Sequence, residues 1–304
     1  MIELIKNTKI DFMGKRKYAF ILSGILLVIG VIALFQISRG EANLGIDFAG
    51  GTAVQVKFSK PVSVHEVRRA LEGAGLREMD IQDFPAVNKV LVRVKGKQET
   101  LGNISNLIID ALTGKFADAS PVIDSTTEIG PKVGSRLKHD ALIAALFATF
   151  GILIYIAFRF QWRFSIGATI ATFHDVLAVL GIFFVLGKEI NLILVSALLI
   201  VAGYSLTDTV VVFDRIRENM RAALKDRTDV IVNRSLNEVL SRTAITSMTT
   251  LFASLALLLL GGEVIHDFAL AITIGILVGT YSSWFVASPT VLLISGGKNP
   301  FKKS

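Results

Sequence analysis

The stretch VAGYSLTDTVVVFDRIRE, residues 201–218, decides how the rest of this sequence is interpreted. It overlaps an apolar run, residues 190–212, that is long enough to cross a bilayer, since a spanning helix needs about 20 residues. The run nevertheless contains Asp208, and an aspartate near the middle of a spanning helix costs about 2.5–3.5 kcal/mol on insertion scales. Such a residue normally faces a protein interior or a water-filled path and has a function there. Asp208 is therefore the first candidate functional residue. The alternative is an acid that only holds helices together through hydrogen bonds to Ser or Thr.

The composition of the whole chain is typical of a membrane protein. Of the 304 residues 52% are hydrophobic, the mean hydropathy is +0.60, and the apolar residues gather in long runs. The net charge of +7 does not indicate a nucleic-acid-binding protein, because the basic residues lie beside the apolar runs, where they set membrane topology. The chain has no cysteine, which excludes disulfides and thiolate metal sites.

Six apolar runs predict six transmembrane helices. The first run, residues 18–37, follows a basic segment, residues 1–17. The run is longer than a signal-peptide core of about 7–15 residues, and no small-residue cleavage site follows it. We therefore expect an uncleaved first span with its N-terminus in the cytoplasm. The other predicted spans are residues 140–158, 164–186, 190–212, 243–262 and 267–294.

The distribution of basic residues predicts the orientation of these spans. With a cytoplasmic N-terminus, the inner segments are residues 1–17, 159–163, 213–242 and 295–304. They hold 17 Lys and Arg residues, whereas the two short outer turns hold only Lys188. This excess is the positive-inside asymmetry of membrane proteins. It places both termini in the cytoplasm and residues 38–139 outside.

The polar segment 38–139 is predicted to be a small α+β domain. Its 14 basic and 12 acidic residues leave it nearly neutral. Alternating apolar residues indicate strands, and apolar residues at helical spacing indicate helices. The expected elements are strand 51–58, helix 62–75, strands 80–84 and 89–95, helix 99–112 and strand 119–129. This β-α-β-β-α-β order is the ferredoxin-like pattern. The predicted fold is thus an α-helical membrane protein with one exported ferredoxin-like domain between its first and second spans.

Five short motifs lie in order along the chain. They are LGIDFAGGT at 44–52, IGPKVG at 129–134, His174-Asp175 in the third span, the stretch 201–218 in the fourth, and NRSLNEVLSRTAITSMTT at 233–250. Each motif alone is moderately specific, and the ordered set is strongly specific. Over nearly the whole chain it resembles the SecF family, the smaller membrane subunits of bacterial SecD–SecF protein-export complexes.

This resemblance implies a multi-pass protein of the RND-permease type in the bacterial cytoplasmic (inner) membrane. Members of the family act with SecD, the SecYEG channel and often YajC, and use the proton gradient to help pull unfolded translocating proteins outward. Asp208 and Arg242, the arginine that opens the fifth span, match the family residues implicated in proton conduction. The motif residues expected at the entry from the first span into the outer domain are Gly45, Asp47, Gly50 and Gly51.

Polar side chains accompany Asp208 and Arg242 in the predicted spans. Tyr204 lies four residues before Asp208, on the same helix face. A hydroxyl stripe follows Arg242 on one face of the fifth span; it consists of Thr243, Ser247, Thr250 and Ser254. The stripe either carries interhelical hydrogen bonds or a thin file of water, or is close packing of small residues. Because arginine hardly ever releases its proton, Arg242 either tunes the charge of Asp208 or anchors the helix at the cytoplasmic surface.

His174 and Asp175 form a second polar pair inside the membrane. Adjacent residues on a helix point about 100° apart, so both cannot face one partner directly. We expect Asp175 to face the fourth and fifth spans. His174 is either a group that titrates near neutral pH or a hydrogen-bonded structural residue, and the second interpretation is preferred.

The sequence lacks the motifs of an enzyme. Neither GxxxxGK[ST] nor HExxH occurs, and no nucleophile–base set is evident. We therefore expect no catalytic residue, cofactor, metal site or nucleotide engine. The available energy source is a gradient, worth about 2.3 kcal/mol per charge per 100 mV of membrane potential.

Two other functions fit a six-span chain of this kind. The first is a small-molecule exporter of the RND type, which the single small outer domain disfavours. The second is a purely structural assembly partner, in which Asp208 only holds helices together. The favoured function is proton-coupled assistance of protein export.

Overall fold

The computed structural model describes residues 8–76, 79–95 and 101–302. The first seven residues of the predicted N-terminal segment and the expected helix start at 99 lie outside these ranges. The chain forms two compact units. One unit is the segment Leu44–Ile143, and the other combines Met1–Asn43 with Ala144–Ser304.

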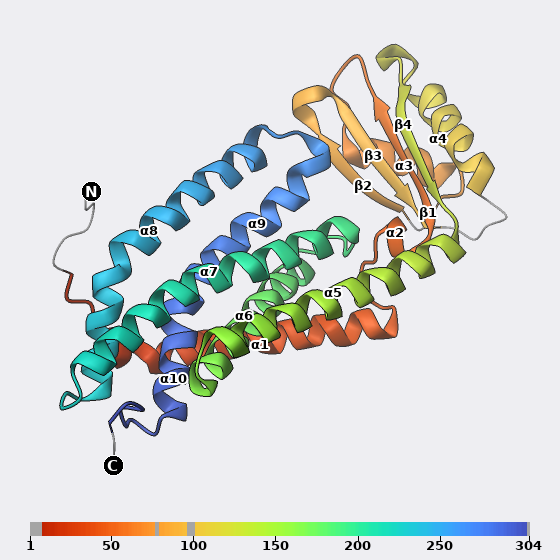
Figure 1. Ribbon diagram of the computed structural model, residues 1–304. Coiled ribbons are helices and arrows are strands. Elements are labelled where there is room, and N and C mark those ends of the chain that lie inside the picture. The colour runs from red at the N-terminus through yellow and green to blue at the C-terminus, as the bar shows by residue number, and fades with distance from the viewer. Residues whose placement is uncertain (1–7, 77–78, 96–100, 303–304) are drawn as a thin grey trace. The chain divides into compact units, whose positions relative to one another are not determined.

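Long apolar helices make up the second of these units (Figure 1). In the described chain, six helical segments are long and apolar enough to cross a membrane, which confirms the predicted number of spans. The helices are α1 (Phe12–Arg39), α5 (Pro131–Arg159), α6 (Trp162–Val185), α7 (Leu192–Ala222), α8 (Thr228–Leu260) and α9 (Glu263–Ser282). After α9 the chain continues through a π-helical turn, η3 (Ser283–Ala287), into α10 (Ser288–Ile294). The sixth span is therefore one long segment with a π-helical interruption.

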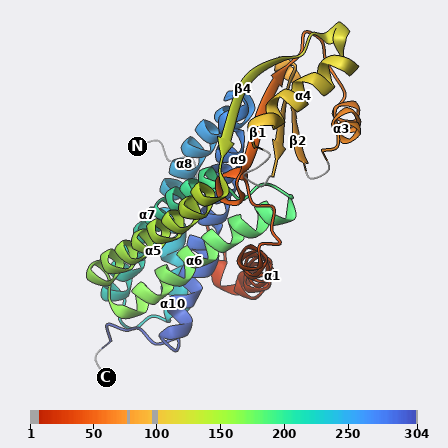
Figure 2. The ribbon, with the colours of Figure 1, turned by 90° about the vertical axis from the view of Figure 1, so that its right-hand side faces the viewer.

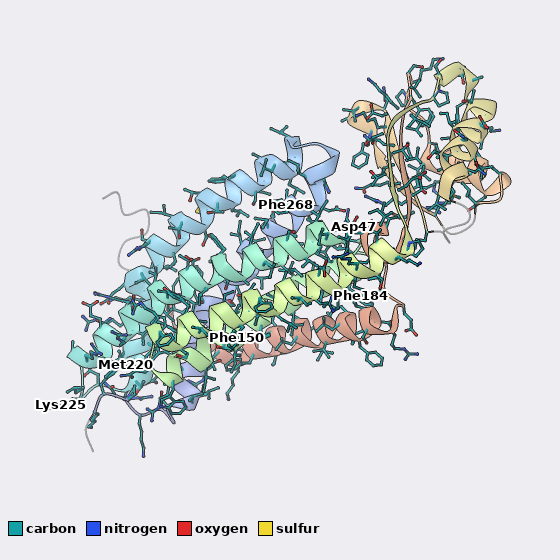
Figure 3. All side chains as sticks on the ribbon, turned by 45° about the vertical axis from the view of Figure 1, so that its right-hand side comes forward. Asp47, Phe150, Phe184, Met220, Lys225 and Phe268 are labelled. Carbon is teal, nitrogen blue, oxygen red and sulfur yellow. The ribbon has the colours of Figure 1, made fainter. Side chains whose placement is uncertain are left out.

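Several helices extend beyond the apolar runs that predict them. Helix α1 begins at Phe12, where the carboxylate of Asp11 accepts a hydrogen bond from the backbone N–H of Gly14 at 2.9 Å and caps the helix. The predicted connection 213–242 is mostly helical, because α7 continues to Ala222 and α8 begins at Thr228. Only the turn 223–227 lies between them, with Lys225 exposed in it (Figure 3). The connection is thus a helical hairpin.

Helices α6, α7 and α9 form the centre of the helical unit. Each packs against the other two, α1 packs against α6, and α8 packs against α7 and α9. The contact between α1 and α6 is very close: a Cβ atom on Gly30 would lie 2.3 Å from the carbonyl oxygen of Leu177, so only glycine fits there. By contrast, Phe150 of α5 is exposed, as are many large apolar residues of α1 and α5 (Figure 3). Such apolar outer faces fit a lipid environment.

The unit Leu44–Ile143 contains a four-stranded antiparallel sheet with two helices on one face (Figure 2). Its elements are α2 (Ile46–Ala49), β1 (Gly51–Lys57), α3 (Val64–Gly73), β2 (Met79–Phe84), η1 (Pro85–Val87), β3 (Lys89–Val94), α4 (Leu101–Lys115), η2 (Ala117–Ala119) and β4 (Val122–Ile129). The strand order is β2-β3-β1-β4, with β1 antiparallel to both of its neighbours. This arrangement is the predicted ferredoxin-like topology.

The core of this unit follows from the alternation of its strands. Inward-facing residues such as Val54 and Val92 are fully buried against Leu71 of α3 and Ile108 of α4. Successive strand residues point to opposite faces of a sheet, so only every second position joins this core. The alternating sequence therefore determines which face the helices cover.

Candidate functional site

Asp208 lies in the interior of the helical unit, on α7. Its side chain is 5% exposed, and its carboxylate accepts two hydrogen bonds from α8. Ser247 donates its hydroxyl to Oδ2 at 3.1 Å, and Thr246 donates its hydroxyl to Oδ1 at 3.4 Å. Asp208 therefore joins α7 to α8 through hydroxyl groups.

The network around Asp208 continues into α9. The hydroxyl of Thr280 donates to the hydroxyl oxygen of Ser247 at 2.8 Å. One residue after Asp208, the hydroxyls of Thr209 and Ser283 lie 3.0 Å apart and join α7 to the π-helical turn. Four elements thus meet within one helical turn of a single carboxyl group.

The predicted hydroxyl stripe of the fifth span divides into two kinds of residue. Ser247 and Ser254 make contacts between helices, the latter accepting from Thr273 of α9 at 3.0 Å. Thr243 and Thr250 donate only to backbone carbonyls of their own helix. The stripe therefore carries interhelical hydrogen bonds at two of its four positions.

Arg242 is exposed and stands apart from Asp208. In the part of the chain that the structure describes, no ion pair or side-chain hydrogen bond joins the two residues. The partners of Asp208 on α8, Thr246 and Ser247, follow Arg242 by four and five residues, which is about 6–7.5 Å of helix. Tyr204 shares the α7 face of Asp208 as expected, and its buried hydroxyl has no hydrogen-bond partner among the described residues.

His174 and Asp175 are both completely buried on α6. The Nδ1 atom of His174 lies 2.8 Å from Oδ1 of Asp175, so the two adjacent residues pair with each other. The other carboxylate oxygen accepts hydrogen bonds from Ser205 of α7 and from Ser282 at the end of α9, the latter at 2.7 Å. Asp175 therefore binds three side chains from three helices.

The prediction for the surroundings of Asp175 is half correct. It faces the fourth span, as expected, but its other partner is Ser282 of the sixth span and not a residue of the fifth. The reason is the packing order, because α6 packs against α7 and α9, whereas α8 lies against the far side of these two helices. Sequence periodicity could not reveal that order.

Sequence reasoning missed several residues of these two networks. They are Thr246 and Thr280 around Asp208, and Ser205 and Ser282 around Asp175. A signal existed for Ser205, which lies three residues before Asp208 and therefore on a neighbouring part of the same helix face. No local signal distinguished Thr280 or Ser282 from the other hydroxyl residues of the last span.

The motif at 233–250 has a second role that its sequence did not reveal. Asn233 and Asn237, one turn apart on α8, bind the segment before and at the start of α1. Asn233 accepts from the N–H of Met13 at 2.9 Å and donates to Asp11 at 2.8 Å, and Asn237 exchanges two hydrogen bonds with the backbone of Ile10. Two asparagines thus hold the start of the first span against the fifth.

At two positions of the glycine motif, near the start of the unit Leu44–Ile143, the backbone conformation requires glycine. Gly50 and Gly51 have φ angles of 78° and 147°, which residues with a side chain rarely adopt. A Cβ atom on Gly51 would also lie 2.4 Å from the carbonyl oxygen of Val94. Gly45 has an ordinary φ of −67° as the N-cap of α2, and Asp47 lies in the first turn of that helix (Figure 3).

The described residues contain no cluster of three or more His, Cys, Asp or Glu side chains that could hold a metal ion. The buried chemistry of this chain instead consists of carboxyl, imidazole and hydroxyl groups. Groups of this kind bind and release protons or hold helices together.

Comparison with known proteins places these features in a family. Residues 109–296 match the model of the SecD/SecF protein-export membrane proteins, C-terminal part, and residues 42–62 match the SecD/SecF GG motif. The chain is 57% identical over 305 residues to protein translocase subunit SecF of Thermodesulfovibrio yellowstonii, covering 100% of both chains. It is 40% identical to the SecF subunit of Vibrio alginolyticus, covering 96% of this chain and 92% of that one.

A solved structure has the same fold. The crystal structure of SecDF from Thermus thermophilus, described as a translocon-associated membrane protein, superimposes with a TM-score of 0.82 at 36% identity. The match covers 97% of this chain but only 40% of the SecDF chain. This sequence thus spans less than half the length of that relative.

Proposed function

Because this chain belongs to the SecD/SecF family of protein-export membrane proteins, we propose that it works as a SecF subunit that couples the proton gradient to the outward movement of translocating proteins. The chain is a multi-pass membrane protein with a role in protein export. The proposal adds the energy source, the residues that use it, and the partners.

The observation that carries the proton-coupled function is the set of hydroxyl groups around Asp208. An ionised carboxylate only accepts hydrogen bonds, whereas a protonated carboxyl also donates one. A hydroxyl group can do either, so Ser247 and Thr246 can satisfy both protonation states of Asp208 with little movement of their heavy atoms. A lysine or arginine at hydrogen-bonding distance would instead favour the ionised state alone.

Arg242 is proposed to bias this exchange. It lies about one helical turn from the α8 residues that bind Asp208, and its exposed side chain makes no ion pair among the described residues. A movement of α8 along α7 that brought the guanidinium closer would stabilise the ionised carboxylate, and the reverse movement would favour its protonation. Proton uptake and helix position are linked in this way.

The proposed partners follow from the family. The chain is similar to part of a SecDF chain, and we propose SecD as its direct partner. We further propose that the pair acts at the SecYEG channel, with YajC, on unfolded translocating proteins. The energy comes from the gradient and not from a nucleotide bound to this chain.

The proposed orientation has both termini in the cytoplasm and the unit Leu44–Ile143 on the outer side of the bacterial cytoplasmic membrane. The support is the excess of basic residues in the segments assigned to the inside. There the outer domain would meet the emerging protein or the outer domain of SecD. Crosslinks from it to an arrested export substrate would favour the first of these contacts.

The deciding experiment replaces Asp208 with Asn. This change keeps the shape of the side chain and most of its hydrogen bonding, but removes its titration. The Asp208→Asn complex with SecD should assemble at normal levels in proteoliposomes and lose gradient-dependent proton flux and stimulation of export. Asp226→Asn, in the exposed turn between α7 and α8, is the matched control and should behave as wild type.

The same experiment separates the alternatives. If Asp208 only holds helices together, the Asn variant should support normal export and normal flux, because Asn also binds across helices. If the chain exports small molecules, Asp208→Asn should impair extrusion of a small-molecule probe and leave protein export unchanged. Either result would overturn the proposed function.

A further inference from the structure

Two buried carboxyl groups of the helical unit, those of Asp175 and Asp208, are linked through helices α7 and α9. Among the described residues, the buried titratable side chains are His174, Asp175, Glu189 and Asp208. Asp208 lies on α7, and Asp175 is bound by Ser205 of α7. The proposed function uses only Asp208 and leaves Asp175 without a role.

Helix α7 connects the two carboxyl groups directly. Ser205, which donates to Asp175, lies three residues before Asp208, about 4.5 Å along the helix axis. Thr209, the residue after Asp208, binds Ser283 of the π-helical turn. A small rotation or shift of α7 would therefore change the hydrogen bonds of both carboxyl groups together.

Helix α9 connects them a second time. Thr280 reaches Ser247, the partner of Asp208, while Ser282 binds Asp175 at 2.7 Å. These two residues project from different faces of α9, toward α8 and α6 respectively. Helices α9 and α7 lie in close contact here, since a Cβ atom on Gly279 would lie 3.0 Å from the Cβ of Ser205.

The π-helical turn begins directly after Ser282. A π-helical turn is a rare, wider turn that occurs often at functional sites. Ser288, the first residue of α10, donates its hydroxyl to the carbonyl oxygen of Ser283 in this turn at 2.9 Å. The last partner of Asp175 thus lies at the joint between a regular helix and a segment of different winding.

The direction of the three hydrogen bonds to Asp175 depends on whether its carboxyl group is ionised. As a carboxylate it accepts from His174, Ser205 and Ser282 at once. As a protonated carboxyl it must donate one hydrogen bond, so one of these three partners has to turn its donor away or separate. Protonation therefore changes the hydrogen bonding of the Asp175 carboxyl with His174, with α7 or with α9.

The other groups around the pair are neutral or weakly acidic. Tyr281 of α9 faces His174, with 6.3 Å between the ring centres, and its hydroxyl binds Ser23 and the carbonyl oxygen of Ala19 on α1. The π-helical turn presents Ser283, and α10 and α1 contribute no buried titratable side chain within the described ranges. The Nε2 atom of His174 is buried without a partner among the described residues.

We propose that the Asp175–His174 pair is a second proton-binding site of this protein, coupled to Asp208 through α7 and α9, so that a change of protonation at one carboxyl alters the proton affinity of the other. The proposal rests on the proposed function, since it requires that Asp208 titrates. By linkage the effect is reciprocal: each carboxyl shifts the affinity of the other by the same factor.

The experiment is difference infrared spectroscopy of the SecD-bound full chain in lipid, titrated with pH, because a protonated buried carboxyl gives its own C=O stretching band. The wild type should show two bands from this chain, of which Asp208→Asn removes one and Asp175→Asn the other. In each variant, the proton concentration at the midpoint of the remaining band should change by a factor of about 5 or more. This factor should be the same in both variants within error.

Milder variants keep the proposal testable if Asp175→Asn does not fold. Ser205→Ala and Ser282→Ala each remove one of the three hydrogen bonds and keep both carboxyl groups, so each should displace both bands. Thr207→Ala is the matched control, since its exposed hydroxyl donates only to the carbonyl of Gly203; it should displace neither.

The possible failures are distinguishable. Loss of every titrating band of this chain in Asp208→Asn alone would show that Asp175 does not titrate, and would overturn the inference while the proposed function stands. If every band that remains in each variant keeps its wild-type midpoint, the coupling is overturned. If Asp208→Asn removes no band, then Asp208 does not titrate, and both the inference and the proposed function are wrong.

Discussion

The hydroxyl oxygen of Ser247 lies 3.1 Å from Oδ2 of Asp208, and the same hydroxyl accepts a hydrogen bond from Thr280. One serine thus joins three helices at the buried carboxyl group.

Ser247→Ala should weaken both the stability and the activity of the protein. The variant removes one hydrogen bond from Asp208, which keeps that of Thr246, and one from Thr280, which keeps the carbonyl of Ile276. A lost hydrogen bond of this kind costs about 0.5–1.5 kcal/mol. We expect a lower thermal midpoint of the purified complex and a reduced proton flux. Thr249→Ala is the control, because the exposed Thr249 hydroxyl donates only to a carbonyl of its own helix. Equal effects of the two variants would contradict this role of Ser247.

The size of the export defect in Arg242 variants should depend on the charge and shape of the new side chain. Arg242→Lys keeps a charge but loses the planar guanidinium group, so we expect an intermediate loss of gradient-dependent export. Arg242→Gln removes the charge and should approach the defect of Asp208→Asn. Arg227→Gln, at an exposed position in the turn before α8, should have little effect. A wild-type rate in Arg242→Gln would show that the residue only anchors the helix end.

Reporter fusions should confirm the proposed orientation. A reporter that is active only outside the cytoplasm should be active when inserted at Lys60, in the turn between β1 and α3, and silent at Lys225, in the turn between α7 and α8. The physical reason is the excess of basic residues beside the inner ends of the spans. The opposite pattern would overturn the orientation.

Gly51→Ala should destabilise the outer domain. The alanine would carry a Cβ 2.4 Å from the carbonyl oxygen of Val94 and would retain an unfavourable φ of 147°; strain of this kind costs about 1–3 kcal/mol. We expect a lower midpoint of cooperative urea unfolding in a fragment of residues 40–137, which contains the core of this domain. Gly73→Ala is the control, because α3 has open space there and alanine favours a helix. It should be neutral or stabilising.

The N-terminal end of α1 should loosen in acid. Hydrogen bonds from the Gly14 backbone and the Asn233 side chain lower the pKa of Asp11 below its ordinary value of 3.8. A carboxyl with a lowered pKa stabilises the folded state above its unfolded pKa, and this contribution disappears as the pH falls below about 3.8 through the folded pKa. Hydrogen exchange of the Gly14 and Met13 amides should therefore accelerate relative to other α1 amides in this range. The acceleration should be absent in Asp11→Ala, whose exchange is already fast at neutral pH.

The sequence alone determined the six spans, the small α+β domain and the choice of Asp208 as a candidate residue. Apolar length decides whether a helix can span a bilayer, and strand alternation decides the order of elements in the outer domain; both are local properties of the chain. The cost of an acid in an apolar run is also local. For these features no information about distant contacts was needed.

The partners of the buried acids were decided by the tertiary structure. The spans are apolar around most of their circumference, so the sequence carries little information about how each helix is rotated toward its neighbours. It therefore could not show that Asp175 binds Ser205 and Ser282 and, within the described part of the chain, has no partner on the fifth span. Nor could it show that Ser247, and not Arg242, contacts Asp208. The packing of helices far apart in sequence fixes these rotations, because side chains interlock at positions that no single helix specifies.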